Sequence, residues 1–234
     1  IHERIDSLDD EAKVLIKVCS CFGFEFRQEN LENVAPQFLS SKDALKSTLA
    51  TLAARGLVVA VTGESVSKMM KFTHQIITES AYSLMLDSQK REVHKAIANE
   101  FESASFKYEL DVLAYHWLRS GDVERGCDML QSAAEKAISI FALKECVNSL
   151  GQAIAYGKDH PNLPYWLVRL AQVRANMGDL VTRDRLLYDA LKALNDDEIN
   201  PQVRSKLTME RIQGEYGELG DIPTSTDEKF SILD

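Results

Sequence analysis

The sequence contains no long apolar run. No segment approaches the roughly 18–20 consecutive apolar residues that a membrane-spanning helix needs, and the first residues, IHERIDSLDDEAK, lack the basic start and apolar centre of a signal peptide. A basic excess is also missing. The net charge at pH 7 is −9, so neither nucleic acid nor a membrane is an expected partner. These absences predict a soluble, cytoplasmic protein.

Cysteines at metal-binding or redox spacing are missing too. The four cysteines form no CxxC pair, and each lies within an apolar helical pattern, where a thiol behaves as a small buried hydrophobe. Cys19 and Cys21 cannot hold one ion together, because residues two apart on a helix point about 200° away from each other. We therefore expect four reduced, structural cysteines. They are Cys19, Cys21, Cys127 and Cys146.

Nucleotide-binding and zinc motifs are absent as well. No GxxxxGK[ST] pattern occurs, and the nearest candidate, Gly63 to Lys68, has one glycine and the wrong spacing for a phosphate cradle. His74, His94 and His116 could be imagined around a zinc ion, but no HExxH or Cys/His ligand spacing accompanies them. Buried imidazoles bonded to backbone carbonyls explain them equally well. The sequence predicts no catalytic, cofactor-binding or metal-ligating residue, and no enzyme activity of its own.

The first third of the chain predicts three short helices and a hairpin. Capping residues precede each apolar helical pattern, and glycine or proline follows it. A β-branched run and a second short run are separated by turn residues, which is typical of two paired strands. This order describes a winged helix. The segments are a helix ending at Gly23, a helix from Gln28 to Val34, a helix from Ser40 to Gly56, and strands over 57–61 and 68–72.

The remainder of the chain predicts stacked antiparallel helices. Apolar residues repeat at helical spacing over 76–85 and again over 93–101, and no convincing strand occurs between Tyr108 and Gly217. Breaks recur about every 15 to 20 residues, which suits a helical array. The breaks lie at Gly121-Asp122, Ile140-Phe141, His160 to Pro164, Gly178-Asp179 and Asn195 to Pro201.

Two of these breaks match tetratricopeptide helix pairs. In each, a Leu-Ala pair precedes a Gly-Asp turn, and a leucine and an alanine follow it at matching distances. The turns are Gly121-Asp122 and Gly178-Asp179, and a weaker third match ends at 215–221. Gly126 and Arg183 replace the usual small alanine, so we interpret the units as degenerate tetratricopeptide-like repeats. The predicted fold is mainly α: a winged helix followed by an α-helical solenoid.

Three runs resemble a known family. They are Phe72 to Tyr82, Lys90 to Ala98, and Ala114 to Trp117 with Gly121-Asp122. They resemble the region that follows the P-loop NTPase domain of STAND-type signalling proteins, and most closely the C-terminal region of soluble adenylyl cyclases and related class III nucleotide cyclases. The resemblance covers about residues 6–193. It implies a parent protein with NTPase or cyclase domains, and ATP bound upstream rather than in this segment.

The resemblance also implies a structural role for nine residues. We expect them to serve packing and coupling between domains, since no reactive constellation accompanies them. They are Phe72, His74, Tyr82, Arg91, His94, His116, Trp117, Gly121 and Asp122. Phe72 is expected to close the wing, and His74 and Tyr82 to tie the next helix to it.

These observations predict four segments. Residues 1–86 form the winged helix, 87–108 a connecting helix, 109–220 the helical repeats and 221–234 a polar tail. Residues 109–234 carry 21 acidic and 14 basic side chains, which would favour basic segments in protein partners. The upstream domains of the same chain are the other expected partners. The solenoid lacks a polar capping repeat, so self-association through its C-terminal end is also expected.

The predicted function is that of a non-catalytic regulatory and protein-interaction segment. It would couple an NTPase core to a partner-binding helical surface. The alternative is a DNA-binding winged helix of a STAND-type transcription regulator, with the third helix in the major groove. That helix offers Lys42, Lys46 and Arg55 but no Arg/Asn/Gln cluster suited to bidentate base contacts. Salt-dependent duplex binding would distinguish the two functions.

Overall fold

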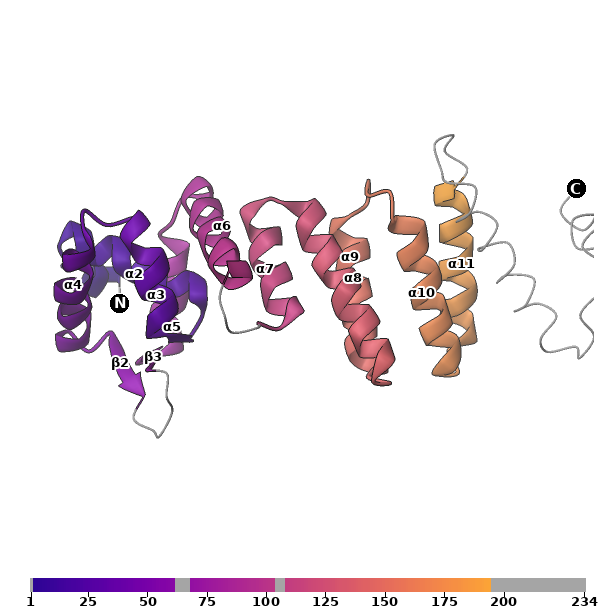
Figure 1. Cartoon of the computed structure of the whole chain (residues 1–234), viewed down its shortest axis with the longest axis horizontal. Helices are drawn as coiled ribbons and strands as arrows, with labels where there is room; N and C mark the ends of the chain where they lie inside the picture. The colour runs from indigo at the N-terminus through magenta and orange to yellow at the C-terminus, as the bar shows by residue number, and fades with distance from the viewer. Residues whose placement is uncertain (1, 62–67, 104–107, 195–234) are drawn as a thin grey trace, which may run out of the picture. The chain divides into compact units, whose positions relative to one another are not determined.

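The computed structural model describes residues 2–61, 68–103 and 108–194 (Figure 1). The chain divides into two compact units, and the boundary in the sequence lies between Gly126 and Cys127. Within the described ranges, every helix is too short or too polar to cross a membrane. Most described residues lie in helices, and the first unit also contains a small sheet. The prediction of a mainly helical fold is confirmed.

The first unit contains seven helices, a three-stranded sheet and the start of an eighth helix, among the described residues. In chain order its elements are α1 (His2–Asp6), α2 (Asp10–Phe22), β1 (Glu25–Arg27), α3 (Gln28–Val34), the 3-10 turn η1 (Ala35–Gln37), α4 (Lys42–Ala54), β2 (Val58–Val61), β3 (Met69–Phe72), α5 (Gln75–Ser83), α6 (Asp87–Ser103), α7 (Leu110–Ser120) and the first residues of α8 (Val123–Ser139).

Local capping explains where the first helices begin and end. The Asp9 carboxylate accepts from the backbone N–H of Ala12 at 2.7 Å, and the Ser41 hydroxyl accepts from that of Ala44 at 3.1 Å. Each bond satisfies one of the free N–H groups at a helix start. Gly23 and Gly56 follow α2 and α4 with positive φ, which glycine adopts at low cost.

The sheet is antiparallel, with the strand order β1-β3-β2. Strands β2 and β3 form at the predicted places, whereas β1 was not predicted. Its central residue, Phe26, pairs with Met70, and the Phe26 ring meets the Phe72 ring edge at 6.1 Å. The predicted hairpin turn at 62–65 lies outside the described residues. Strand β1 therefore joins the segment before α3 to the β2–β3 pair.

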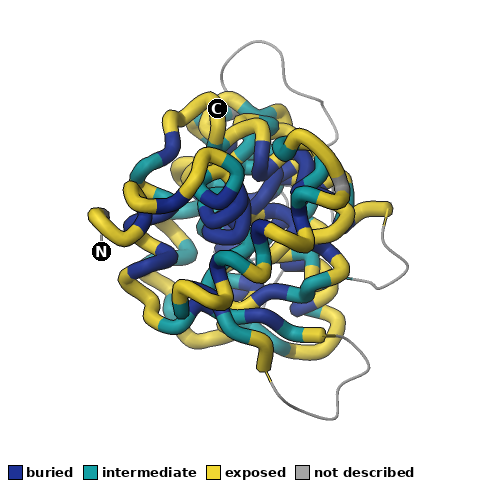
Figure 2. The backbone as a smooth tube through the Cα atoms, turned by 90° about the vertical axis from the view of Figure 1, so that its left-hand side faces the viewer, coloured by how far each residue is buried: buried dark blue, intermediate teal, exposed yellow. Residues whose placement is uncertain are grey.

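The core of the first unit joins its helices to the sheet. Phe72 is completely buried, and the Phe22 ring lies 6.0 Å from Phe26 and 6.2 Å from Phe101, so α2, β1 and α6 share one aromatic cluster. Figure 2 shows buried and exposed positions alternating along the helices, as amphipathic segments require. Other fully enclosed side chains are Leu15, Ile16, Leu31, Leu52, Ile77 and Ile97.

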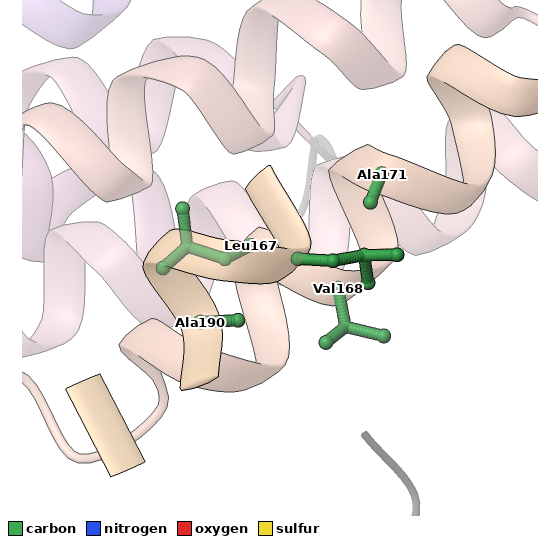
Figure 3. Close-up of a cluster of buried hydrophobic side chains, with 5 residues drawn as sticks. Leu167, Val168, Ala171 and Ala190 are labelled. Atoms are coloured by element: carbon green, nitrogen blue, oxygen red, sulfur yellow. The ribbon is translucent and has the colours of Figure 1, made fainter. Parts of the chain in front are cut away.

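The second unit is helical throughout its described part. It contains most of α8, then α9 (Leu143–Tyr156), α10 (Leu163–Asn176) and α11 (Leu180–Leu194). Helix α10 packs against α9 and α11, and short connections make these neighbours antiparallel (Figure 1). Figure 3 shows the apolar cluster between α10 and α11. It comprises Leu167, Val168, Ala171, Leu187 and Ala190.

Three turns between helices share one hydrogen-bonding pattern. In each, a residue with positive φ donates its N–H to the carbonyl three residues back, and the following residue donates to the carbonyl five residues back. This is the Schellman motif that ends many helices. The positive-φ residues are Gly121, Phe141 and Gly178, spaced 20 and 37 residues apart.

Equivalent positions around the three turns carry equivalent buried residues. An alanine stands seven residues before each positive-φ residue, a leucine nine after it and an alanine twelve after it. The sets are Ala114, Ala134 and Ala171; Leu130, Leu150 and Leu187; and Ala133, Ala153 and Ala190. Helix α8 thus closes one repeat unit and opens the next. This shared helix explains why Gly121 and Gly178 are 57 residues apart, where two full units would take about 68.

Candidate functional site: a histidine chain and an exposed turn patch

The structure brings three of the nine signature residues into direct contact. The Tyr82 hydroxyl lies 3.1 Å from His94 Nε2, and His94 Nδ1 lies 2.9 Å from His116 Nδ1. We call these three residues the histidine chain. They come from α5, α6 and α7, so the chain connects three consecutive helices of the first unit. Both imidazoles are buried, and Tyr82 is partly exposed.

The remaining signature residues lie around this chain or apart from it. Trp117 is fully buried and donates its indole N–H to the Glu102 carboxylate at 2.8 Å. Arg91 is exposed, and its side chain lies beside Gly121. His74 is exposed and makes no side-chain capping bond to α5. Phe72 belongs to the aromatic cluster of the sheet, and Asp122 follows Gly121 in its turn.

Burial keeps both histidines neutral. Desolvation is the larger cause for each: it lowers the pKa of His94 to about 4, with the Arg119 cation adding to the effect. The pKa of His116 falls to about 3, with His94 as the second cause. Protonating either ring would place a charge in a poorly solvated site. At neutral pH the histidine chain is therefore an uncharged hydrogen-bonded network.

The histidine chain is not arranged as a metal site. The two Nδ1 atoms face each other across one hydrogen bond, so the lone pair of one is already engaged by the proton of the other. Over the described ranges, no group of three or more His, Cys, Asp or Glu side chains has an arrangement that could hold a metal ion. The arrangement supports packing and hydrogen bonding between helices.

The four cysteines are buried free thiols. Cys21 donates to the Met85 sulfur at 3.6 Å, and Cys127 donates to the Ala153 carbonyl at 3.7 Å. Burial raises the pKa of Cys21 to about 12 and that of Cys127 to about 11. A thiol so far from its thiolate form is a poor nucleophile and a poor metal ligand.

Phe141 is the most exposed large apolar side chain among the described residues. It is 87% exposed, and its neighbour Ile140 is 67% exposed. Its φ of 57° lies in the left-handed region, where Gly121 and Gly178 serve at the equivalent turns. A side chain with a Cβ is strained there by about 1–2 kcal/mol. This turn therefore combines backbone strain with an exposed aromatic ring.

The residue after Phe141 also departs from the other two turns. Asp122 and Asp179 each accept, through Oδ1, the backbone N–H three residues ahead at 3.1 Å, and so cap the helix that follows. Ala142 stands at the same position and makes no side-chain capping bond. A missing cap of this kind costs about 1 kcal/mol. The Phe141 turn is thus weaker in two independent ways than its equivalents.

Exposed apolar side chains from two turns lie at the same end of the second unit. Since α9, α10 and α11 alternate in direction, the turn before α9 and the turn before α11 lie at the same end, the lower one in Figure 1. Ile140 and Phe141 come from the first turn. Met177, Leu180 and Val181 come from the second and are 42%, 39% and 84% exposed. We call these five residues the turn patch.

Four charged side chains near the turn before α11 form two ion pairs with each other. Arg174 lies 3.6 Å from Asp179, and Arg183 lies 2.7 Å from Asp184. The described array is also nearly balanced, with 11 acidic and 10 basic residues over 109–194, whereas 195–234 carry 10 and 4. The acidity expected on the repeats thus falls mostly on residues outside the described ranges. The five side chains of the turn patch themselves offer an apolar surface.

Helix α4 offers less for DNA reading than its sequence suggested. Thr48 is buried at 6% exposure and belongs to the packed face of α4 with Leu45 and Leu52. Ser47 and Thr51 remain near the surface, but the Ser47 hydroxyl donates to the Ala44 carbonyl and the Thr51 hydroxyl to that of Ser47. The protons of these two hydroxyls are therefore already used within the helix, whereas Lys46 remains exposed.

The turn patch was not predicted as a site. The break at Ile140-Phe141 was recognised, but phenylalanine concealed its equivalence to the two Gly-Asp turns. The offsets of Ala134, Leu150 and Ala153 from Phe141 were the available signal.

A comparison with solved structures supports the fold. The chain is similar to the crystal structure of the Signal Transduction ATPase with Numerous Domains (STAND) protein with a tetratricopeptide repeat sensor from Pyrococcus horikoshii. The TM-score is 0.60 at 15% sequence identity, and the match covers 93% of this chain and 30% of that chain. No family model and no curated protein sequence matches. The likeness shows that this chain shares the fold of the matched part of that protein.

Proposed function

We propose that this chain is a non-catalytic regulatory and protein-interaction segment of a larger signalling protein with a STAND-type NTPase or a class III nucleotide cyclase. The likeness in fold to a STAND protein with a tetratricopeptide repeat sensor supports this. Residues 1–86 would be a winged helix packed on the NTPase core, residues 87–108 its connection and 109–220 the partner-binding repeats. ATP would bind upstream in the parent protein.

The observation that carries this proposal is Phe141 at a glycine position. The fold is served well by Gly-Asp at the two equivalent turns, which relieves strain and caps the next helix. The Phe141-Ala142 turn has neither the relaxed backbone nor the helix cap, and the Phe141 side chain is 87% exposed. Strain kept without a packing benefit marks a functional position. We infer that the ring is retained to contact another protein.

The size of the contact can be bounded. Fully burying a phenylalanine side chain is worth about 1.5–3 kcal/mol, and most of the Phe141 ring is available for burial. An exposed aromatic side chain entering an apolar pocket is a frequent anchor of protein interfaces. Its loss would weaken binding roughly 10- to 100-fold.

The test uses the whole chain as bait in an extract of its source cells, followed by reconstitution with each purified captured protein. Phe141→Gly should lower the affinity at least about tenfold, because the ring is lost while the turn becomes less strained. Tyr156→Ser is the matched control, since Tyr156 is a 51% exposed aromatic residue at the other end of α9. It should leave the affinity unchanged.

Two results would contradict the proposal. Equal affinity of the Phe141→Gly and unaltered chains for every reconstituted partner would remove the turn patch from partner binding. ATP turnover by the purified chain would contradict a non-catalytic role.

A further inference from the structure

The histidine chain has a fixed capacity for protons. The 2.9 Å separation of the two Nδ1 atoms is that of a hydrogen bond, which needs one proton and one accepting lone pair. The outer nitrogen, His94 Nε2, lies 3.1 Å from the Tyr82 hydroxyl, which can donate or accept. In the neutral state, one proton therefore sits between the two rings.

One further proton fits this geometry, and a second does not. A His94 cation can donate from Nδ1 to His116 and from Nε2 to the Tyr82 oxygen, so every bond survives. If His116 also gains a proton at Nδ1, two N–H groups point at each other across 2.9 Å. The two histidines therefore titrate as a coupled pair. Uptake of the second proton requires the two rings to separate, because the facing N–H groups repel each other.

Among the described residues, no acid acts on the two rings strongly enough to offset such a charge. On α7, the Arg119 cation disfavours a charged His94, and the Tyr115 ring meets the His94 ring edge at 5.5 Å. On α6, the Lys90 ammonium lies 5.0 Å from the Tyr82 ring centre. Asp87, the acid that bears on Tyr82, pairs with Lys90 at 3.3 Å.

The other neighbours are neutral. Cys21 on α2 bears on Tyr82 but has a pKa raised to about 12 by burial, so it stays a thiol. Phe101 on α6 meets the His116 ring edge at 5.3 Å and stacks on Tyr108 at 3.8 Å. The surroundings thus stabilise neutral rings and leave a cation pair without compensation.

We propose that the histidine chain is a proton-operated latch between α6 and α7, closed while both rings are neutral and opened when acidification charges them. The physical direction follows from the lowered pKa values. Stability contributed by the neutral rings is fully present above the unfolded pKa of about 6.5. It is lost as pH falls towards the folded pKa, which is about 4 for His94 and about 3 for His116. The latch does not depend on the proposed partner binding.

The test is hydrogen–deuterium exchange of the whole chain at pH 7 and pH 5, corrected for intrinsic exchange rates. The opening equilibrium of α6 and α7 should rise roughly 30-fold at pH 5 for each histidine that becomes solvated, because pH 5 lies 1.5 units below the unfolded pKa. The double variant His94→Gln with His116→Gln keeps hydrogen-bonding groups but cannot titrate. It should lose this response, while His74→Gln, at an exposed histidine, should retain it.

A second measurement keeps the proposal testable if the double variant does not fold. Ring resonances of His94 and His116 in the unaltered chain should stay neutral through pH 6.5 and change together with the α6 and α7 exchange. Rings that titrate near pH 6.5 without opening would overturn the latch. So would unchanged protection at pH 5, or a loss of protection spread evenly over every helix.

Discussion

Replacing Phe141 with glycine should stabilise the second unit, although it removes a large apolar side chain. Relief of the left-handed strain is worth about 1–2 kcal/mol, and the extra freedom of glycine in the unfolded chain costs about 0.5–1 kcal/mol. Because the side chain is 87% exposed, its loss forfeits little burial. We expect a net gain of about 0.5–1 kcal/mol. Adding Ala142→Asp should contribute about 1 kcal/mol more, through the missing helix cap.

The assay is urea unfolding followed by far-UV circular dichroism, with hydrogen exchange of α9 as the local measure. The matched control is Gly178→Phe, which creates the same strain at an equivalent turn. A Cβ at Gly178 would have no atom within 4 Å, so the cost there is set by the backbone alone. We expect a loss of about 1–2 kcal/mol.

The two substitutions should change the free energy of unfolding in opposite directions. This expectation would be refuted if Phe141→Gly lowered the unfolding free energy, since the side chain would then contribute more to packing than its exposure indicates. It would also fail if Gly178→Phe were tolerated like an ordinary surface substitution, within about 0.5 kcal/mol.

Two further predictions concern close packing and the thiols. A Cβ at Gly126 would lie 2.6 Å from the Leu118 side chain, so Gly126→Ala should cost about 1–3 kcal/mol in urea unfolding. In a double-mutant cycle, Leu118→Ala should reduce that cost; strictly additive effects would show that the two positions do not touch. The four buried thiols should react with iodoacetamide at pH 7.5 far more slowly in the folded chain than in urea, and fast alkylation of the folded chain would contradict their burial.

Local signals were sufficient for much of the first unit. The helix Gln28–Val34 was predicted with the bounds that it has, because a proline follows its last turn and ends the pattern. The two hairpin strands were also found from their composition. Strand β1 was missed because three residues, Glu25–Arg27, are too few for an alternating pattern. Its existence depends on pairing with β3, which is 42 or more residues away in the chain.

The histidine chain shows the limit of sequence reasoning at the site. Tyr82, His94 and His116 were each singled out, but their mutual contacts depend on how α5, α6 and α7 cross. His94 and His116 are 22 residues apart, and no periodicity within one helix relates their rings. Two repeats were recognised because glycine and aspartate at their turns are signals within the local sequence. The repeat around Phe141 carries neither residue at its turn. Its equivalence to the other two is visible only in the backbone hydrogen bonds.

The Phe141 turn also affects how this protein could be engineered. A consensus design that chose the commonest residue at each repeat position would write Gly-Asp into all three turns. The product would be more stable, and selection for expression or heat resistance would favour it. It would also have lost the aromatic ring that we assign to partner recognition. In this array, a screen based on stability alone would therefore discard the residue that we propose contacts a partner.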